Sequence, residues 1–339
     1  MRVYIPKANG KERPLGIPTI KERIVQMSCK LVIEPIFEAD FEESSYGYRP
    51  KRGAKEAIGA IRRELKTGRT EVLDADLSAY FDTIPHDRLL QTVSQRISDK
   101  NVLHLIKMWL KAPVWDERDG GSAKKNKVGT PQGGVISPLL ANIYLHLVDR
   151  LINKVNSIIQ KYGVRIVRYA DDFVLLGKTI PPAVLDKLKS ELRRMGLSLN
   201  EEKTRTVNVR ESAFDFLGFT IRYDRDLHGR DRKYLNIIPS RKSCQKVRDK
   251  IKECLQDNPN ASPHKLAAEL NKIIQGWTNY LRIAGVSYPK KAFRDLRYFL
   301  MAKLDRYYYR KSQRKSKLYR QRAFDVLVRK YGLIDPSKC

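Results

Sequence analysis

Aspartates stand at two places in this 339-residue sequence where the neighbouring residues predict β-strands. Asp171 and Asp172 lie between two apolar runs, residues 165–168 and 173–176, so we expect them at the tip of a β-hairpin. Adjacent carboxylates repel each other, and a turn that needs only polarity can use Asn-Gly instead. The pair therefore indicates a site where cations neutralise it; a solvated loop is the alternative.

A second pair of aspartates lies in the apolar run of residues 72–82. Strand alternation places Asp74 and Asp76 on one face, and beside the hairpin one of them would complete a carboxylate cluster with Asp171 and Asp172. Such a cluster suits two Mg²⁺ ions, which prefer oxygen ligands, and Mn²⁺ could substitute for them. Two ions about 3.5–4 Å apart can activate a hydroxyl and stabilise a leaving phosphate oxygen. This is the chemistry of nucleotidyl transfer, although an Asp-x-Asp strand can also be purely structural.

The composition sets limits on the partner and on the class of protein. A formal net charge of +29 favours a polyanion, with nucleic acid the first candidate and an acidic membrane surface the second. A hydrophobic content of 42% excludes wholesale disorder. We find no run of the roughly 18 apolar residues that a membrane span needs and no signal-peptide core. Four scattered cysteines without a CxxC pair disfavour a disulfide framework or zinc ribbon and fit a reducing cytosol.

The elements that must position the carboxylates form two parts of different pattern. Before about residue 222, predicted helices alternate with strands at 71–77, 165–176 and 216–221, and one of these helices has the amphipathic spacing of Ala54, Ala57, Ile58, Ile61 and Leu65. After 240 four helices are expected, at 241–256, 263–283, 289–310 and 317–331. Residues 222–339 also carry 30 Lys and Arg against 11 Asp and Glu. We therefore predict an α+β catalytic body at 1–222, a connecting hairpin or linker at 223–240 and a basic helical domain at 241–339.

The motifs, taken in order along the chain, resemble those of bacterial group II intron reverse transcriptases. Tyr-Ala-Asp-Asp at 169–172 resembles the signature box of reverse transcriptases, and the Pro-Gln-Gly-Gly block at 129–145 resembles the group II form of its neighbour. The other matching blocks are residues 5–19, 45–50, 76–82, 196–204, 216–219 and 276–282. The resemblance implies a right-hand polymerase fold, with fingers and palm built on an antiparallel sheet, followed by an α-helical thumb of the maturase type.

By this resemblance, Asp76, Asp171 and Asp172 are the catalytic carboxylates that bind Mg²⁺. Asp76 is preferred to Asp74 because it stands four residues before Tyr80, as in the family. Asp82 is interpreted as structural.

The resemblance also implies residues that hold the incoming nucleotide. Tyr80 would be an aromatic gate against the ribose 2′-hydroxyl, with a core tyrosine as the alternative. Gln132 would hydrogen-bond near the nucleotide, and Lys203 would assist the leaving pyrophosphate unless it is a plain surface lysine. Lys7 and Arg13, with Lys11 as a weaker candidate, would grip the triphosphate, against solvated hairpin charges as the alternative.

Residues that contact the primer and template form a further group. Arg49 would either anchor the fingers to the palm or touch the template. Gly133 would let the backbone approach the nascent base pair, and Phe216, Leu217 and Gly218 would form a primer-gripping turn unless the two apolar side chains are core. The last helices are expected to bind RNA through basic side chains interleaved with tyrosines. The thumb candidates are Lys290, Lys291, Arg294, Arg297, Arg306, Arg310, Lys311 and Arg314.

The implied partners are an RNA template, a DNA or RNA primer and deoxynucleotides, and group II intron RNA if a maturase role is retained. We expect no membrane partner, a place in the bacterial cytosol near the nucleoid, and no particular oligomeric state. The usual N-terminal extension and HNH endonuclease of intron-encoded relatives are not recognisable. Two alternatives stay open: a splicing maturase with secondary polymerase activity, and a defence-associated reverse transcriptase such as one serving CRISPR adaptation.

Overall fold

The structure is a computed structural model that describes residues 2–6, 12–115, 123–125, 128–131, 133–225, 233–283, 289–309 and 318–339. The chain divides into two compact units, residues 1–208 and 209–339. This division differs from the domain boundary at residue 222 predicted from the sequence. Residues 209–222 belong to the second unit because their strands pair within that unit's own sheet.

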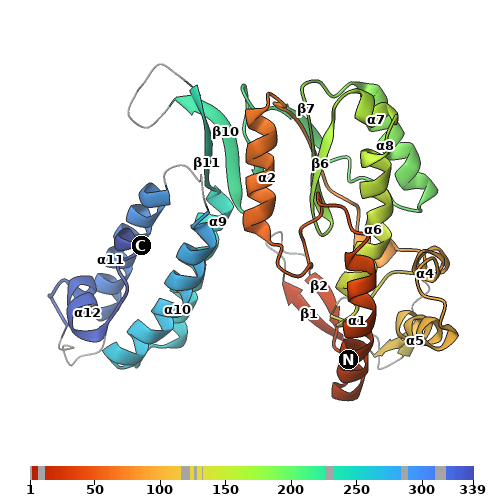
Figure 1. The fold of residues 1–339 in the computed structure, drawn as a ribbon. Helices are drawn as coiled ribbons and strands as arrows, with labels where there is room; N and C mark the ends of the chain where they lie inside the picture. The colour runs from red at the N-terminus through yellow and green to blue at the C-terminus, as the bar shows by residue number, and fades with distance from the viewer. Residues whose placement is uncertain are drawn as a thin grey trace. The chain divides into compact units, whose positions relative to one another are not determined.

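A four-stranded antiparallel sheet forms the centre of the first unit, with the strand order β6-β7-β3-β8. Its strands β6 and β7 are labelled in Figure 1. Alternate residues of the central strands, such as Leu73 and Phe173, lie in the main core, while Val72 and Val174 face the other way and are also buried. The sheet is therefore covered on both faces. Its strands are β3 (Glu71–Ala75), β6 (Arg165–Tyr169), β7 (Asp172–Gly177) and β8 (Arg205–Asn208).

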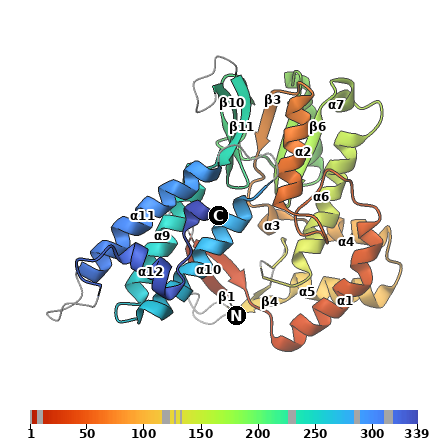
Figure 2. The same ribbon diagram turned by 60° about the vertical axis from the view of Figure 1, so that its left-hand side comes forward.

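Helices cover this sheet, and α2 and α6 both contact β6 (Figure 2). The amphipathic spacing expected in the sequence is confirmed in α2, where Ala57, Ile58, Ile61 and Leu65 are buried. The helices of the unit are α1 (Ile20–Glu38), α2 (Ala54–Lys66), α3 (Tyr80–Thr83), α4 (His86–Ser94), α5 (Lys100–Lys111), α6 (Ser137–Asn153), α7 (Ile158–Lys161) and α8 (Pro182–Arg194). Two small hairpins, β1 (Arg2–Pro6) with β2 (Glu12–Gly16) and β4 (Pro113–Trp115) with β5 (Ala123–Lys125), complete it.

The second unit joins a three-stranded antiparallel sheet to a group of helices. The strands are β9 (Phe214–Phe216), β10 (Phe219–Arg225) and β11 (Lys233–Pro239), in the order β11-β10-β9. The helices are α9 (Arg241–Asp257), α10 (Pro263–Leu281), α11 (Pro289–Tyr309) and α12 (Ala323–Tyr331), followed by the 3₁₀ helix Pro336–Lys338. Leucines and aromatic side chains of all four α-helices share one core.

The helices after residue 240 agree closely with the expected ranges, except for the last. That helix was expected from residue 317, but it begins at Ala323 because residues 318–321 form a turn, and the Ala323 amide donates to Asp305. The segment expected as a hairpin or linker at 223–240 is part of an antiparallel hairpin over its described residues, since β10 pairs with β11 from Phe219–Pro239 to Arg225–Lys233. Within the described residues, the structure has no helix both long and apolar enough to span a membrane.

Candidate functional site

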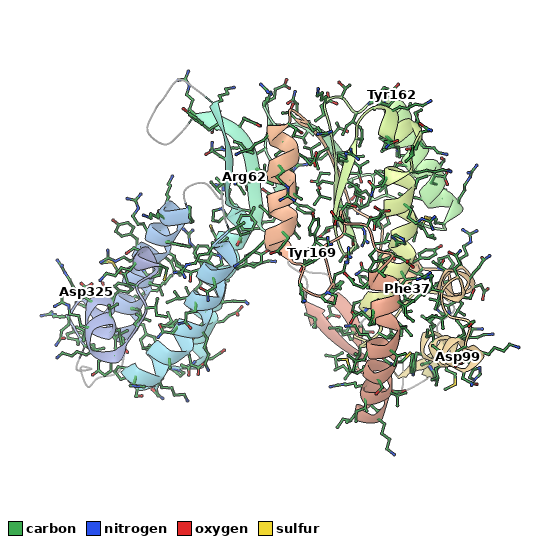
Figure 3. The ribbon with its side chains drawn as sticks, viewed as in Figure 1. Phe37, Arg62, Asp99, Tyr162, Tyr169 and Asp325 are labelled. Carbon is green, nitrogen blue, oxygen red and sulfur yellow. The ribbon has the colours of Figure 1, made fainter. Side chains whose placement is uncertain are left out.

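The predicted Asp-Asp hairpin is present at the end of β6 and β7. Tyr169, labelled in Figure 3, pairs with Asp172, so Ala170 and Asp171 form a two-residue turn. Ala170 has φ 57°, a left-handed conformation that costs a residue with a Cβ about 1–3 kcal/mol unless its surroundings impose it. Gly47 supplies part of those surroundings, because a Cβ on it would lie 2.3 Å from the Ala170 nitrogen.

A fully buried ion pair lies directly behind this turn. Arg168 and Asp149 have no exposed side-chain surface, and Nη2 of Arg168 lies 2.6 Å from Oδ2 of Asp149. Arg168 also donates to the Ala170 carbonyl at 2.9 Å and to Asn142, whose amide donates to the Gly47 carbonyl. Breaking one partner of such a pair is costly, because it leaves a buried charge uncompensated. The network therefore fixes the turn that carries Asp171.

Sequence reasoning missed this network. Its one visible signal was Arg168, which stands inside a predicted strand directly before the hairpin tip. A strand that is buried on both faces should carry no charge unless the charge is paired. The partner, 19 residues earlier, could not be identified before the pairing of α6 with β6 was known.

The second group of aspartates lies where β3 ends. Asp74 stands two residues after Val72 on β3, and Asp172 stands two residues before Val174 on β7. Because Asp74 pairs with Val174 and residues two apart share a face, both carboxylates lie on the same face of the sheet. Asp76 comes directly after β3, which ends at Ala75, so it lies just beyond the strand in which the sequence analysis placed it.

The chain segment at 198–204 lies against the end of β3. The Asp76 carbonyl accepts a hydrogen bond of 2.7 Å from the Asn200 amide, and Nζ of Lys203 lies 2.8 Å from Oδ2 of Asp76. This hydrogen bond to Asp76 is the main reason that the pKa of Lys203 is raised. Lys203 is therefore ion-paired with Asp76, although its side chain stays two-thirds exposed, and its role toward pyrophosphate stays a prediction.

The carboxylates act on one another's protonation. The pKa of Asp172 is raised to about 6, first by desolvation from surrounding protein atoms and then by the charges of Asp171, Asp76 and Asp74, against which Lys203 acts. Asp172 keeps part of its surface in contact with water. A cluster of carboxylates that holds excess negative charge in this way is a favourable place for cations.

The donor set fits hard divalent cations in chemistry, because it consists of carboxylate oxygens. As the side chains are placed, no three acidic, histidine or cysteine side chains of the described residues converge closely enough to hold an ion. Asp76 instead holds the Lys203 ammonium. A cation that binds Asp76 must therefore compete with Lys203.

Tyr80 is buried, with 2% of its surface exposed, and its hydroxyl donates to the Ala141 carbonyl at 2.7 Å. This is the position expected of a core tyrosine. The carboxylate of Asp171 is one of the charges that raise the pKa of Tyr80, after desolvation as the largest cause, so the ring lies near the hairpin tip as well. The gate role stays a prediction.

Two glycines of the 129–134 loop are required by backbone contacts. Gly129 and Gly133 have φ of 86° and 113°, and a Cβ on Gly133 would lie 2.5 Å from the Gly16 carbonyl oxygen of β2. In the described residues, Gly133 therefore approaches the backbone of the protein's own β1–β2 hairpin. Gln132 lies outside the described residues.

Arg49 was predicted either to anchor the fingers or to contact the template, and the structure favours the anchor. Its guanidinium lies 2.7 Å from Oε1 of Glu38 and donates to the carbonyls of Glu42 and Ser45, and its side chain is 2% exposed. Such a saturated group is not available to a template. Lys7 and Lys11 lie outside the described residues, and Arg13 is described only as a backbone position in β2.

The turn that was expected to grip the primer lies in the second unit. Phe216 is 4% exposed, so it is core, whereas Leu217 and Gly218 form a turn with φ of 47° and 78°. The Tyr280 hydroxyl donates to the Leu217 carbonyl at 2.7 Å, a contact that holds this strained turn.

Among the thumb candidates, Lys290, Lys291, Arg294 and Arg306 are exposed on α11. Arg297 is different, because it faces Asp335 at 3.5 Å and lies over the Phe324 ring, so it has a structural role. Arg310, Lys311 and Arg314 lie outside the described residues.

Comparison with known proteins identifies two families along the chain. Residues 5–221 match the family described as reverse transcriptase (RNA-dependent DNA polymerase), and residues 244–324 match the group II intron, maturase-specific domain. Protein YkfC of Escherichia coli is 37% identical over 277 residues, which cover 71% of this chain and 71% of YkfC. Group II intron-encoded protein LtrA of Lactococcus lactis is 40% identical over 152 residues, covering 44% of this chain and 25% of LtrA.

A solved telomerase from Candida albicans has the same fold, with a TM-score of 0.54 at 13% identity over 89% of this chain and 58% of that one. The mixed helix and sheet of residues 1–208, with its hairpin of aspartates, is accordingly a reverse transcriptase fold. The chain belongs to the reverse transcriptase family, the RNA-dependent DNA polymerases, and carries the maturase-specific domain of group II intron proteins.

Proposed function

We propose that this chain extends a primer with deoxynucleotides at the hairpin tip. Asp76, Asp171 and Asp172 would hold two Mg²⁺ ions, or Mn²⁺ in their place, and these ions would supply activation of the primer 3′-hydroxyl and charge neutralisation at the phosphate. The observation that carries the proposal is that the Asp171–Asp172 turn and the end of β3 lie at one end of the same sheet, in a chain whose residues 5–221 match the reverse transcriptase family. Reverse transcriptases in general use divalent metal ions.

The protein's own groups have distinct parts in this proposal. The Arg168–Asp149 pair orients the turn that carries Asp171. Nζ of Lys203 lies 2.8 Å from the Asp76 carboxylate. When a cation binds Asp76, the Lys203 ammonium would be released from this carboxylate and could bind the departing pyrophosphate. Tyr80 would present its ring to the sugar and exclude a ribose 2′-hydroxyl. Lys7, Arg13 and Gln132 remain candidates for holding the triphosphate.

The maturase-specific domain supports RNA binding as a second activity. We propose that residues 241–339 bind the primer and RNA template, and the chain's own group II intron RNA where splicing is retained, in the bacterial cytosol. Exposed Lys290, Lys291, Arg294 and Arg306 on α11 would contribute charge to these contacts. A maturase with only secondary polymerase activity is less favoured, because binding alone gives no reason to keep repelling carboxylates together.

The decisive experiment compares Asp171→Ala with Asp186→Asn, an exposed aspartate of α8, in primer extension on an RNA template and in splicing of an intron RNA. Asp171→Ala is expected to abolish extension, because it removes one of the three carboxylates proposed to hold the metal ions, while Asp186→Asn keeps it. Circular dichroism checks that both variants fold. DNA synthesis by folded Asp171→Ala at the wild-type rate would refute the assignment.

A further inference from the structure

Helix α1 of the first unit presents an apolar side to solvent. Its buried residues are Gln26, Ile33 and Phe37, which lie on the side that packs on the unit. A helix on the surface of a soluble protein normally buries its apolar side, as α2 does. In α1 the opposite side carries six large apolar side chains that are 43% to 74% exposed, here called the α1 stripe: Ile20, Ile24, Val25, Met27, Leu31 and Val32. The folding of the described residues gives no reason for this arrangement.

The α1 stripe is continuous along the helix. Ile20, Ile24, Met27 and Leu31 follow one another at intervals of four, three and four residues, which places them in a row about 17 Å long. Val25 and Val32, seven residues apart, continue the apolar side next to this row. At their exposed fractions the six side chains present roughly 600 Å², the upper end of what a soluble monomer leaves uncovered. A row with this spacing is the surface that a second helix covers in a coiled coil.

The charges beside the stripe indicate the kind of helix that would cover it. Lys21 and Arg23 stand beside its first turn, and among the residues that the structure describes neither has a carboxylate within 4.0 Å. The three carboxylates of α1 are all engaged within the protein: Glu22 in a capping box with Thr19, Glu34 in an ion pair with Lys30 and Glu38 in an ion pair with Arg49. The uncompensated charge beside the stripe is therefore positive, and it is complementary to acidic side chains.

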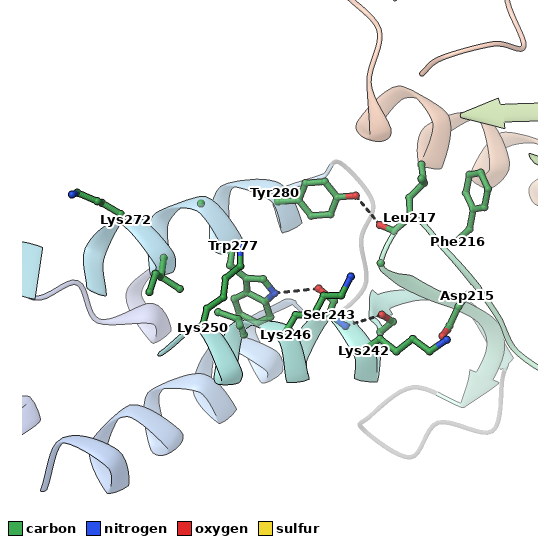
Figure 4. A pocket seen from close by; sticks show the side chains of 15 residues that line it. Asp215, Phe216, Leu217, Lys242, Ser243, Lys246, Lys250, Lys272, Trp277 and Tyr280 are labelled. Carbon is green, nitrogen blue, oxygen red and sulfur yellow. Dashed lines mark hydrogen bonds between the residues drawn. The ribbon is translucent and has the colours of Figure 1, made fainter. Parts of the chain in front are cut away.

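Other kinds of occupant fit this surface less well. Lysines line the groove beside the Leu217–Gly218 turn of the second unit (Figure 4), whereas the α1 stripe has neither cations for successive phosphates nor aromatic rings for bases. Two uncompensated cations are fewer than the clusters of about 4–8 that bind anionic lipid surfaces. A second copy of the chain would bring the same two cations and a further net charge of +29.

We propose that the α1 stripe is a docking surface for an acidic amphipathic helix of a partner protein. The apolar residues of that helix pack on the stripe, and its flanking carboxylates pair with Lys21 and Arg23, as flanking charges select partners in coiled coils. The contact area per partner is below the roughly 800 Å² of a standard interface, so the complex is expected to be transient. The inference does not depend on the polymerase assignment, because neither cation nor stripe belongs to the carboxylate site.

The first test titrates the full chain into a fluorescein-labelled synthetic peptide of three heptads and follows fluorescence anisotropy. The peptide has leucine at the two apolar heptad positions and glutamate at the flanking ones, and its glutamates disfavour pairing with itself. Saturable binding is expected, and a peptide of the same composition in scrambled order should bind far less. Equal binding of the two peptides would reflect only the attraction of an anion to a cationic chain, and it would overturn the proposal.

A pair of double variants locates the binding. Ile24→Gln/Leu31→Gln should weaken peptide binding by about tenfold or more, because two apolar contacts of the stripe are lost. The matched control, Val155→Gln/Tyr162→Gln, exchanges two exposed apolar side chains of the same unit outside α1 and should keep wild-type affinity. Both variants should keep the wild-type denaturation midpoint, because the exchanged side chains are exposed. Wild-type affinity in Ile24→Gln/Leu31→Gln, or a lowered midpoint in that variant alone, would refute a free docking surface.

A charge reversal tests the acidic character of the partner. Lys21→Glu/Arg23→Glu should bind a peptide with lysine at the flanking positions more tightly than the glutamate peptide, the reverse of the wild-type preference. Lys161→Glu/Lys178→Glu changes the net charge of the chain equally, at exposed lysines outside α1, and should keep the wild-type preference. The same preference in both double variants would contradict the proposal.

Two further measurements test the other occupants. Sedimentation of the wild-type chain should show no self-association that Ile24→Gln/Leu31→Gln removes; if it does, the stripe binds a second copy and the proposal is wrong. Flotation with vesicles that contain phosphatidylserine should not distinguish that variant from the wild type. Binding to vesicles that is lost in the variant would identify a lipid surface as the occupant and would equally overturn the proposal.

Discussion

At the scale of single residues, negative charge is concentrated at the candidate site. Asp172 belongs to a group of carboxylates in which Lys203 lies 2.8 Å from Asp76 and Arg205 lies 3.6 Å from Asp74, and the pKa of Asp172 is still raised to about 6. Metal binding would relieve this repulsion, so the features that favour catalysis disfavour the metal-free fold. This opposition can be measured.

We predict that Asp172→Asn stabilises the metal-free protein at pH 7 while it abolishes polymerisation. The folded-state pKa of Asp172, about 6, lies above the ordinary value of 3.8, so protonation of this carboxyl group stabilises the folded state. This contribution is fully present below pH 4 and is lost as the pH rises through 6. Asparagine carries no charge and escapes this loss. Because Asp172 is exposed, solvent screening limits the gain to about 1 kcal/mol.

Urea denaturation of both proteins in EDTA at pH 4 and pH 7 is the measurement. The stability difference between Asp172→Asn and the wild type should grow between these two pH values. A difference that stays constant, or that favours the wild type more at pH 7, would contradict the prediction.

At the scale of elements, the hairpin depends on a close approach between segments far apart in sequence. Gly47 lies against the backbone of Tyr169 and Ala170, and Asn142 of α6 binds the Gly47 carbonyl. The sheet order places β7 between β6 and β3, which brings both groups of aspartates to one end of the sheet. The position of the carboxylates is therefore a property of several elements together.

We predict that Gly47→Ala displaces the hairpin tip. The added Cβ would lie 2.3 Å from the Ala170 nitrogen, a backbone atom that cannot turn away as a flexible side chain can. Overpacking of this kind costs about 1–3 kcal/mol, and we expect a fall in the primer-extension rate of tenfold or more. The control is Gly53→Ala, because a Cβ on Gly53 would meet only the end of the Glu56 side chain, at 3.3 Å. Equal activity in the two variants would argue against the contact.

The sequence was sufficient for the features that depend on local pattern. Apolar runs predicted the strands of the hairpin, apolar spacing predicted α2, local pattern predicted the four basic helices, and two adjacent aspartates predicted the tip. The resemblance to a family supplied the preference for Asp76 over Asp74. Features that depend on long-range pairing were not predictable: the buried partner of Arg168, the anchoring of Arg49 by Glu38, and the bond from Tyr280 to the Leu217 turn.

At the scale of the whole molecule, positive charge and carboxylates are divided between different parts of the chain. Residues 222–339 hold 30 of the 67 Lys and Arg but only 11 of the 38 Asp and Glu, while Asp76, Asp171 and Asp172 all lie in the first unit. Affinity for nucleic acid should therefore depend chiefly on the second unit and on salt. The chemical step should depend on the first unit and on divalent cations.

We therefore predict that salt and divalent cations affect separable steps. If the chain contacts 6–10 phosphates, raising monovalent salt from 50 to 200 mM should weaken primer–template binding by about 10³–10⁵-fold, because bound phosphates release their counterions. Single-turnover extension with saturating template should change far less over the same range, since the metal ions that we propose for the carboxylates of the first unit would be bound at short range. The measurement pairs a binding titration with rapid-quench kinetics at each salt concentration. A chemical step that falls in parallel with affinity, at saturating template, would show that one charged surface serves both binding and catalysis.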